Sequence, residues 1–181
     1  MYLDLDIGNS RSKWRLGEGT EASRGVCAST QQELVSAITA LNGNLEIATQ
    51  SISAIRVASV KGDSFTRSFE TICRSEFSAN LRFALAQKNT LGVQNSYREP
   101  EKMGVDRWCA IAAAVNTNRQ SAPNAGLIAV IDAGSALTID FVMDDGEVGE
   151  HLGGFIVPGF AMQMNALLGG TQRITIDTPR N

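Results

Sequence analysis

Apolar and polar side chains alternate at the start of the chain, and this alternation predicts a β-hairpin. Residues 3–7 (Leu-Asp-Leu-Asp-Ile) have an apolar side chain at every second position, which is the period of a strand with one buried face. Residues 8–10 (Gly-Asn-Ser) interrupt this strand, and a second strand is expected to continue to about Leu16. The same order of strand, acidic residue, tight turn and strand recurs in residues 127–143. The repeat predicts a duplicated unit whose two acidic turns face each other across a cleft.

Between the two hairpins, the apolar residues follow helix and strand periods in turn. A helix is expected to begin within residues 29–33 and to end at residues 42–44 (Asn-Gly-Asn). Residues 55–60 and 81–85 are predicted strands, and residues 63–73 are a predicted helix. This β-β-α-β-α-β order predicts a mixed sheet with helices packed on it.

The second half of the chain begins with a segment that lacks periodicity. Residues 88–102 are polar and contain glycine and proline, so we expect a loop, and loops of this kind often carry functional residues. A helix is expected from Val105 to about Asn118, with Trp108 on its apolar face. After the second hairpin, residues 153–159 are a predicted strand and residues 160–168 a predicted helix.

These elements predict an α/β protein with two domains, each a mixed sheet flanked by helices. A polar linker begins at Ser121, so the expected domains are residues 1–120 and 121–181. The chain has 181 residues, of which 43% are hydrophobic, and this content is ordinary for a globular protein with an apolar core.

The charge and the cysteines exclude several classes of protein. A net charge of −3 disfavours a nucleic-acid or anionic-membrane surface, because such surfaces are bound mainly by clustered Lys and Arg. The chain has no long apolar run and no basic-then-apolar signal at its start, so we expect a cytoplasmic protein that does not associate with membranes. Its three cysteines, Cys27, Cys73 and Cys109, are widely spaced, which predicts buried thiols and neither a disulfide framework nor a zinc site.

The first turn has the residue types of a phosphate and cation site. Asp6 precedes Gly8, which permits a tight turn, and Ser10 and Lys13 add a hydroxyl and a positive charge. An ordinary hairpin turn is an equally good interpretation of this segment taken alone. The second turn weakens that alternative, because Asp132 again precedes a Gly-Ser pair, Gly134 and Ser135. Backbone N–H groups of such turns bind phosphate oxygens while the carboxylate orders Mg²⁺, so we expect an ATP-using phosphotransferase.

A third candidate site lies at the start of the helix predicted from Val105. Gly104, Asp106 and Arg107 occupy its first turn, where the N–H groups and the helix dipole favour anions. In the functional interpretation, Asp106 accepts a hydroxyl proton as a kinase carboxylate does, and Arg107 binds a substrate carboxylate. The alternative is that Asp106 caps the helix and Arg107 is a solvated surface charge. His151, the only histidine, is assigned no role, and Trp14 and Trp108 are expected to be core residues.

Five motifs occur together and in order, and their combination resembles a known family. They are Asp6-x-Gly8-Asn9-Ser10-x-x-Lys13, Gly92-Val93-x-Asn95-x-Tyr97, Gly104-x-Asp106-Arg107-Trp108, Asp132-x-Gly134-Ser135-Ala136-x-Thr138-x-Asp140 and Gly153-Gly154-x-Ile156-x-Pro158-Gly159. In this order and spacing the chain resembles type III pantothenate kinase, of the actin/hexokinase/Hsp70-like ATPase superfamily. The resemblance covers essentially the whole chain.

The resemblance implies a fold, an activity and an assembly. The fold would be two duplicated ribonuclease-H-like, or actin-like ATPase, domains. The activity would be the phosphorylation of pantothenate by ATP, the first step of coenzyme A synthesis, with Mg²⁺ and a monovalent cation, K⁺ or NH₄⁺. The protein would be a homodimer with its active sites at the subunit interface.

The resemblance also implies roles for individual residues, which fall into four groups. Asp6, Gly8, Asn9, Ser10 and Lys13 would form the first phosphate motif, with Asp6 holding Mg²⁺ through water. Asp132, Gly134 and Ser135 would form the second, with Asp132 near the monovalent cation. Asp106 would be the catalytic base, and Tyr97, Gly104 and Arg107 would bind pantothenate.

This sequence departs from the family pattern in two respects. Ser10 and Ser135 stand where many members have threonine, and both keep the hydroxyl. The family continues beyond the segment that corresponds to Thr171–Ile174, so we expect the second domain to lack its C-terminal part here. Two rival interpretations stay open: a non-catalytic accessory factor of the kind described for transcription of virulence genes, and a kinase with another acceptor. Tyr97 and the Gly104-x-Asp106-Arg107 motif count against the second rival.

Overall fold

The structure is a computed structural model in which contacts divide the chain into two compact units. It describes residues 1–17, 22–28, 30–47, 52–77, 80–121 and 126–170. Unit 1 comprises Met1–Ala86 and Glu101–Cys109, and unit 2 comprises Gln87–Pro100 and Ala110–Asn181. The chain therefore passes between the units three times. A domain boundary near residue 120 stays a prediction, because these units are defined by contacts and not by independent folding.

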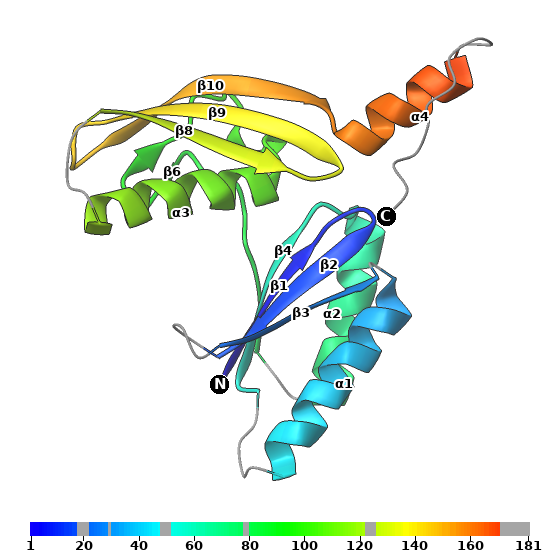
Figure 1. The fold of residues 1–181 in the computed structure, drawn as a ribbon. Helices are drawn as coiled ribbons and strands as arrows, with labels where there is room; N and C mark the ends of the chain where they lie inside the picture. The colour runs from blue at the N-terminus through cyan, green and yellow to red at the C-terminus, as the bar shows by residue number, and fades with distance from the viewer. Residues whose placement is uncertain (18–21, 29, 48–51, 78–79, 122–125, 171–181) are drawn as a thin grey trace. The chain divides into compact units, whose positions relative to one another are not determined.

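Unit 1 is built on a mixed five-stranded sheet with the order β3-β2-β1-β4-β5 (Figure 1). Its strands are β1 (Tyr2–Ile7), β2 (Arg11–Leu16), β3 (Ser23–Ala28), β4 (Ala54–Ser59) and β5 (Asn80–Phe83). The first three strands pair antiparallel, whereas β4 pairs parallel with both β1 and β5. The predicted first hairpin is thus confirmed, with β1 and β2 as its strands.

Two helices cover one face of this sheet, α1 (Gln31–Ile47) and α2 (Asp63–Phe77) (Figure 1). The alternation in β1 places Leu3 and Ile7 against them, and neither side chain reaches solvent. The α1 helix begins where Thr30 Oγ1 accepts the Glu33 N–H, at 3.2 Å. The core therefore lies between the sheet and these helices, and the opposite sheet face carries polar side chains.

Two expectations for unit 1 were wrong. The α1 helix does not end at residues 42–44 but continues to Ile47. A glycine inside a helix costs only about 1 kcal/mol, so it is a weak stop signal. The strand β3 was not expected, because its sequence Ser-Arg-Gly-Val-Cys-Ala does not alternate. It forms by pairing with β2, where Gly25 makes room for the Trp14 ring that a Cβ atom would strike.

Unit 2 contains a second mixed five-stranded sheet, with the order β6-β7-β10-β9-β8. Its strands are β6 (Asn89–Thr90), β7 (Val93–Gln94), β8 (Gly126–Ala133), β9 (Ala136–Asp144) and β10 (Gly149–Pro158). The strands β8, β9 and β10 pair antiparallel, and β7 adds to β10 in parallel. The predicted second hairpin is confirmed, and the strand expected over residues 153–159 begins earlier, at Gly149.

Two further helices, α3 (Val105–Ser121) and α4 (Phe160–Gly170), agree with the sequence predictions. The expected loop over residues 88–102 instead contains the β6–β7 hairpin and a short 3₁₀ helix, Pro100–Lys102. The hairpin turns at Leu91 and Gly92, both with positive φ. Such a two-residue turn lacks the apolar periodicity that would reveal it in a sequence.

The two sheets share a core of three antiparallel strands. The antiparallel order β3-β2-β1 in unit 1 corresponds to β10-β9-β8 in unit 2. In unit 1 the parallel strand β4 follows at the outer edge of β1, whereas β8 has no partner at its corresponding edge within the described residues. The expected α/β fold class is thus confirmed, with two mixed five-stranded sheets. Within the described part of the chain, no helix is long and apolar enough to cross a membrane.

Candidate functional site

The first acidic turn joins β1 to β2 and is tightly closed. The Gly8 N–H donates to the Arg11 carbonyl at 3.2 Å, and a Cβ atom on Gly8 would lie 2.8 Å from that oxygen. Lys61, which follows β4, donates from Nζ to the Asn9 carbonyl at 2.8 Å. Ser10 is exposed at the end of the turn. The turn is therefore held by its own backbone and by the Lys61 side chain, and it presents the Ser10 hydroxyl to solvent.

Asp6 and Lys13 face each other across the strands at the base of this turn. They are paired in register on β1 and β2, and Lys13 Nζ lies 4.0 Å from Asp6 Oδ2. Both side chains are exposed on the sheet face opposite α1 and α2. Beside the glycine turn, the carboxylate can bind a cation and the ammonium group can bind a phosphate.

Next to Asp6 and Lys13, a row of charged side chains crosses the same face of the sheet. It borders a cavity of about 880 Å³. Asp4 lies at its centre, where Arg15 Nη2 and Arg56 Nη2 approach its carboxylate at 2.6 and 3.0 Å. Partial burial raises the pKa of Asp4, but hydrogen bonds and attraction from both arginines outweigh this and lower it from its usual value of 3.8. Arg24 and Arg82 lie at the two ends of the row, on β3 and β5.

The start of α3 supplies the other predicted residues of unit 1. The Trp108 N–H donates to the Gly104 carbonyl at 2.9 Å, which forms the first helical turn. Asp106 Oδ1 accepts the Arg107 N–H at 2.7 Å, and a Cβ atom on Gly104 would lie 2.7 Å from that same Oδ1. Gly104 therefore gives the exposed carboxylate of Asp106 room to fold back on the helix start. Arg107 is 6% exposed, so the interpretation of this residue as a solvated surface charge was wrong.

Asp6 and Asp106 lie in one neighbourhood. Burial raises the pKa of the Cys109 thiol, and the carboxylates of Asp106 and Asp6 raise it further. Cys109 also lines the cavity beside Asp6. The structure thus brings the first acidic turn and the start of α3 together around one thiol. No thiolate function follows, because all three influences favour the protonated form.

The second acidic turn joins β8 to β9 and is held by the end of β10. The Gly134 N–H donates to the Ala136 carbonyl at 2.9 Å, and the Gly159 N–H donates to the Ser135 carbonyl at 3.0 Å. A Cβ atom on Gly159 would collide with the carbonyl oxygens of Gly134 and Ser135. Asp132 and Ser135 are exposed. Glycine at position 159 is therefore required for the close contact that shapes this turn.

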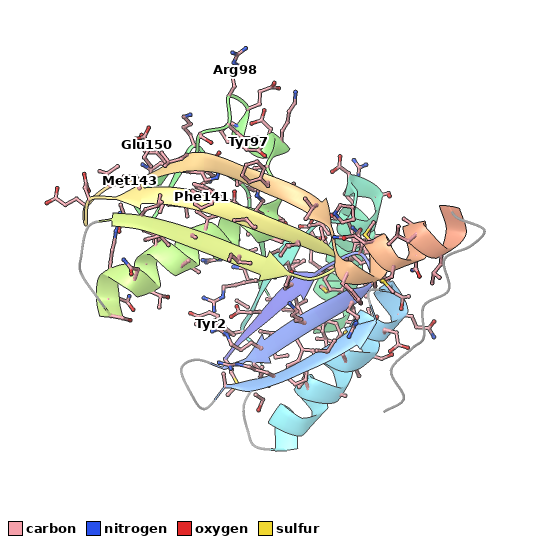
Figure 2. All side chains as sticks on the ribbon, turned by 45° about the horizontal axis from the view of Figure 1, so that its top comes forward. Tyr2, Tyr97, Arg98, Phe141, Met143 and Glu150 are labelled. Carbon is pink, nitrogen blue, oxygen red and sulfur yellow. The ribbon has the colours of Figure 1, made fainter. Side chains whose placement is uncertain are left out.

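Tyr97 lies in the loop after β7, against a buried polar group that sequence reasoning missed. Figure 2 shows Tyr97 beside β10, and its ring is 6.3 Å from the imidazole of His151, between centroids. His151 Nε2 is 2.9 Å from Asp140 Oδ1, and His151 Nδ1 is 2.9 Å from Ser96 Oγ. His151 had no sequence signal beyond being the only histidine, whereas Asp140 was visible as the last residue of the second acidic motif.

The predicted site residues divide between the two units. Unit 1 holds Asp6, Gly8, Asn9, Ser10, Lys13, Gly104, Asp106 and Arg107, and unit 2 holds Tyr97, Asp132, Gly134 and Ser135. Within the described residues, no three His, Cys, Asp or Glu side chains form a metal-binding group. Single carboxylates such as Asp6 and Asp132 suit a cation that keeps most of its ligands as water or phosphate.

Comparison with known proteins finds one family over nearly the whole chain. A family model described as type III pantothenate kinase matches residues 2–181. A type III pantothenate kinase of Chromohalobacter salexigens is 34% identical over 180 residues, which cover 98% of this chain and 58% of that protein. One of Azotobacter vinelandii is 35% identical over 179 residues, which cover 98% of this chain and 65% of that protein. The chain thus spans less than two thirds of the length of these relatives.

Among solved structures, similarity is found to a Ppx/GppA family member of Aquifex aeolicus. The two chains share 9% sequence identity with a TM-score of 0.48, over 92% of this chain and 53% of the other.

Proposed function

Because the chain belongs to the type III pantothenate kinase family, we propose that it carries out the phosphorylation of pantothenate by ATP. This reaction is the first step of coenzyme A synthesis. The observation that carries the proposal is that Asp106 lies in the first turn of α3, one turn before Cys109, and that Cys109 lines the cavity beside Asp6. Phosphoryl transfer needs a base near the acceptor and charge compensation near the phosphates. Asp106 would supply the base, and Asp6 would hold the cation that compensates the charge.

In this proposal each glycine turn binds phosphate oxygens of ATP. Ser10 and Ser135 are exposed beside turns whose backbone is already closed by internal hydrogen bonds. Their hydroxyls can therefore donate to phosphate oxygens without rearrangement of the turn. Lys13 adds a positive charge next to the first turn. Asn9, Gly8 and Gly134 act through the backbone shape that brings these groups close to the phosphates.

Asp6 and Asp132 are the proposed cation ligands. Asp6 would hold Mg²⁺ through water, and Asp132 would lie next to a monovalent cation, K⁺ or NH₄⁺. Carboxylate oxygens are suitable donors for these hard cations; Asp132 is exposed, and the side chain of Asp6 is 48% exposed. When bound, the cations supply compensation for the negative charge of the phosphates.

Asp106 is the proposed base for the primary hydroxyl of pantothenate. Its Oδ1 accepts the Arg107 N–H, which fixes the carboxylate at the helix start and leaves Oδ2 to accept the hydroxyl proton. The hydroxyl oxygen then attacks the γ-phosphorus, and ADP leaves. Arg107 would bind the pantothenate carboxylate, while Tyr97 and Gly104 would contact the rest of the substrate.

The family also supports proposals for assembly and location. We propose a homodimer with active sites at the subunit interface, in the cytoplasm, without nucleic-acid partners. Sedimentation velocity of the purified chain would test the dimer, since a monomer at micromolar concentration contradicts it.

A coupled assay tests the function and the assigned base. The purified chain is expected to convert pantothenate and ATP to 4′-phosphopantothenate and ADP in Mg²⁺ and K⁺. Asp106→Asn should lower kcat at least about a hundredfold, within the range of general-base catalysis. The matched control is Asp63→Asn, which changes an exposed Asp at the start of another helix, α2, and should leave kcat unchanged. Equal rates for Asp106→Asn and the wild type would reject the base, and a folded wild-type chain without turnover would reject the function.

A further inference from the structure

We propose that His151, held by Asp140, is a positioning residue that sets the affinity for the acceptor substrate through the loop of residues 95–97. This inference rests on the proposed function, because it takes Tyr97 as a contact of the acceptor. The prediction is specific: loss of this support weakens binding of pantothenate and leaves binding of ATP nearly unchanged.

The support consists of two buried side chains on neighbouring strands of unit 2. His151 lies on β10 and Asp140 on β9, and their side chains are 0% and 1% exposed. His151 Nε2 and Asp140 Oδ1 are 2.9 Å apart. A different ring orientation would remove His151 from this contact and leave a buried carboxylate oxygen without it. The imidazole is therefore held in one orientation.

The second ring nitrogen reaches the loop. His151 Nδ1 is 2.9 Å from Ser96 Oγ. Because a carboxylate oxygen accepts, Nε2 carries the proton towards Asp140. In the neutral ring Nδ1 then accepts the Ser96 hydroxyl proton, so the same ring contacts both partners. The Ser96 hydroxyl is thus tied to a side chain that cannot turn away.

Two further hydrogen bonds hold the loop on either side of Ser96. Asn95 is buried, and its Oδ1 accepts the Tyr97 N–H at 2.9 Å. Lys88 Nζ donates to the Asn95 carbonyl at 2.8 Å. The Tyr97 ring also lies next to the His151 ring, with the two planes tilted by 31°. His151 therefore lies beside the Tyr97 ring and within hydrogen-bonding distance of Ser96 Oγ, in a position to influence where the loop holds Tyr97.

Asp140 links this loop to the second phosphate turn. It follows Ala136 on the same strand, β9, and shares one strand face with Thr138. The strand that leaves the phosphate turn therefore also carries the support for the acceptor loop, within one unit. A rigid strand of this kind holds an acceptor contact at a constant distance from the turn.

Two single variants test the inference, because each removes one of the two partners of the hydrogen bond between Ser96 and His151. Ser96→Ala removes the hydroxyl from an exposed residue, and His151→Gln keeps an amide near the Nε2 position for Asp140 but cannot reach Ser96. Each should raise the KM for pantothenate about tenfold, the effect expected from the loss of one well-placed hydrogen bond, with the KM for ATP within about twofold. The double variant should be no worse than either single variant, because both remove one interaction.

The matched control is Ser75→Ala, which also removes a serine hydrogen bond, from Oγ to the Ile72 carbonyl, but in α2 of unit 1. It should leave both KM values unchanged. Since His151 is the only histidine, a long-range ¹⁵N spectrum reports its ring alone and should show a changed Nδ1 signal in Ser96→Ala.

The possible outcomes separate the inference from the function it rests on. An active wild type whose variants keep the wild-type KM for pantothenate, or raise the KM for ATP equally, overturns the positioning role and leaves the proposed function intact. A wild type without turnover overturns both.

Discussion

Replacing Arg119 by methionine should destabilise unit 2 because it strips a buried carboxylate of its charge partner. Arg119 near the end of α3 approaches Asp144 at the end of β9 with Nη2–Oδ1 at 2.6 Å and Nε–Oδ2 at 3.2 Å. The Asp144 side chain is 1% exposed and that of Arg119 is 19% exposed. Arg119 Nη1 also donates to the Leu91 carbonyl at 3.1 Å, so it holds the β6–β7 turn as well.

The magnitude follows from the burial of the carboxylate. Breaking a buried ion pair by removing one partner costs about 3–5 kcal/mol, and the partial exposure of Arg119 places the expected loss at the lower end, about 3 kcal/mol. For a chain of this size, that loss lowers Tm by about 6–12 °C. Methionine keeps most of the side-chain volume, so the loss of packing is small. Hydrogen bonds with Asp144 raise the pKa of Arg119 further, so the guanidinium stays charged throughout the measured range.

Urea unfolding followed by circular dichroism measures the loss, and Arg74→Met is the matched control. Arg74 pairs with Glu70 at 2.7 Å, a distance close to that of the Arg119 pair, but its side chain is 69% exposed. The control should cost less than about 0.5 kcal/mol, as exposed helix pairs do. The double variant Arg119→Met with Asp144→Asn should lose less unfolding free energy than the two single variants lose together. A loss for Arg119→Met as small as that of the control would refute the reasoning that burial makes this pair strong.

Two further outcomes follow from close contacts in the site. Gly159→Ala should raise the KM for ATP severalfold, because a Cβ atom there strikes the carbonyl oxygens of Gly134 and Ser135; an unchanged KM with an intact fold would separate this turn from nucleotide binding. Asp4→Asn should destabilise unit 1 at neutral pH, because two arginines lower the pKa of Asp4 in the folded chain. That stabilisation is complete above the unfolded pKa near 3.8 and is lost as pH falls through the folded pKa, so the difference from wild type in urea unfolding should shrink under acid conditions. A difference that stays constant down to about pH 3 would contradict this account.

Most elements were predictable because their signals are local. The alternation in residues 3–7 and the turn that follows placed the first hairpin, and the apolar face of α3 placed Trp108 in the core. The strand β3 was not predictable, since its pairing with β2 depends on Gly25 accepting the Trp14 ring. The extension of α1 to Ile47 was missed because Asn42-Gly43-Asn44 is only a weak stop signal, each residue costing a helix about 1 kcal/mol or less.

In the candidate site, too, the local motifs were predictable and the contacts between distant segments were not. Its turns and the start of α3 are short motifs whose glycines and carboxylates lie within a few residues of each other, so sequence spacing exposes them. The contact of His151 with Asp140 joins two strands, and a register shift between His151 and Gly153 intervenes. A bulge of this kind exchanges the faces of the strand, so alternation in the sequence does not show which way His151 points.

By itself, the sequence determined the two acidic turns, the helix start with Asp106 and Arg107, and the α/β class. Only the tertiary structure decided that Arg107 is buried, that Asp6 and Asp106 share a neighbourhood, and that His151 joins Asp140 to Ser96. The physical reason is the range of the interactions. Turns and helix starts depend on backbone preferences over a few residues, whereas burial and polar pairing depend on strand register and on packing between distant segments.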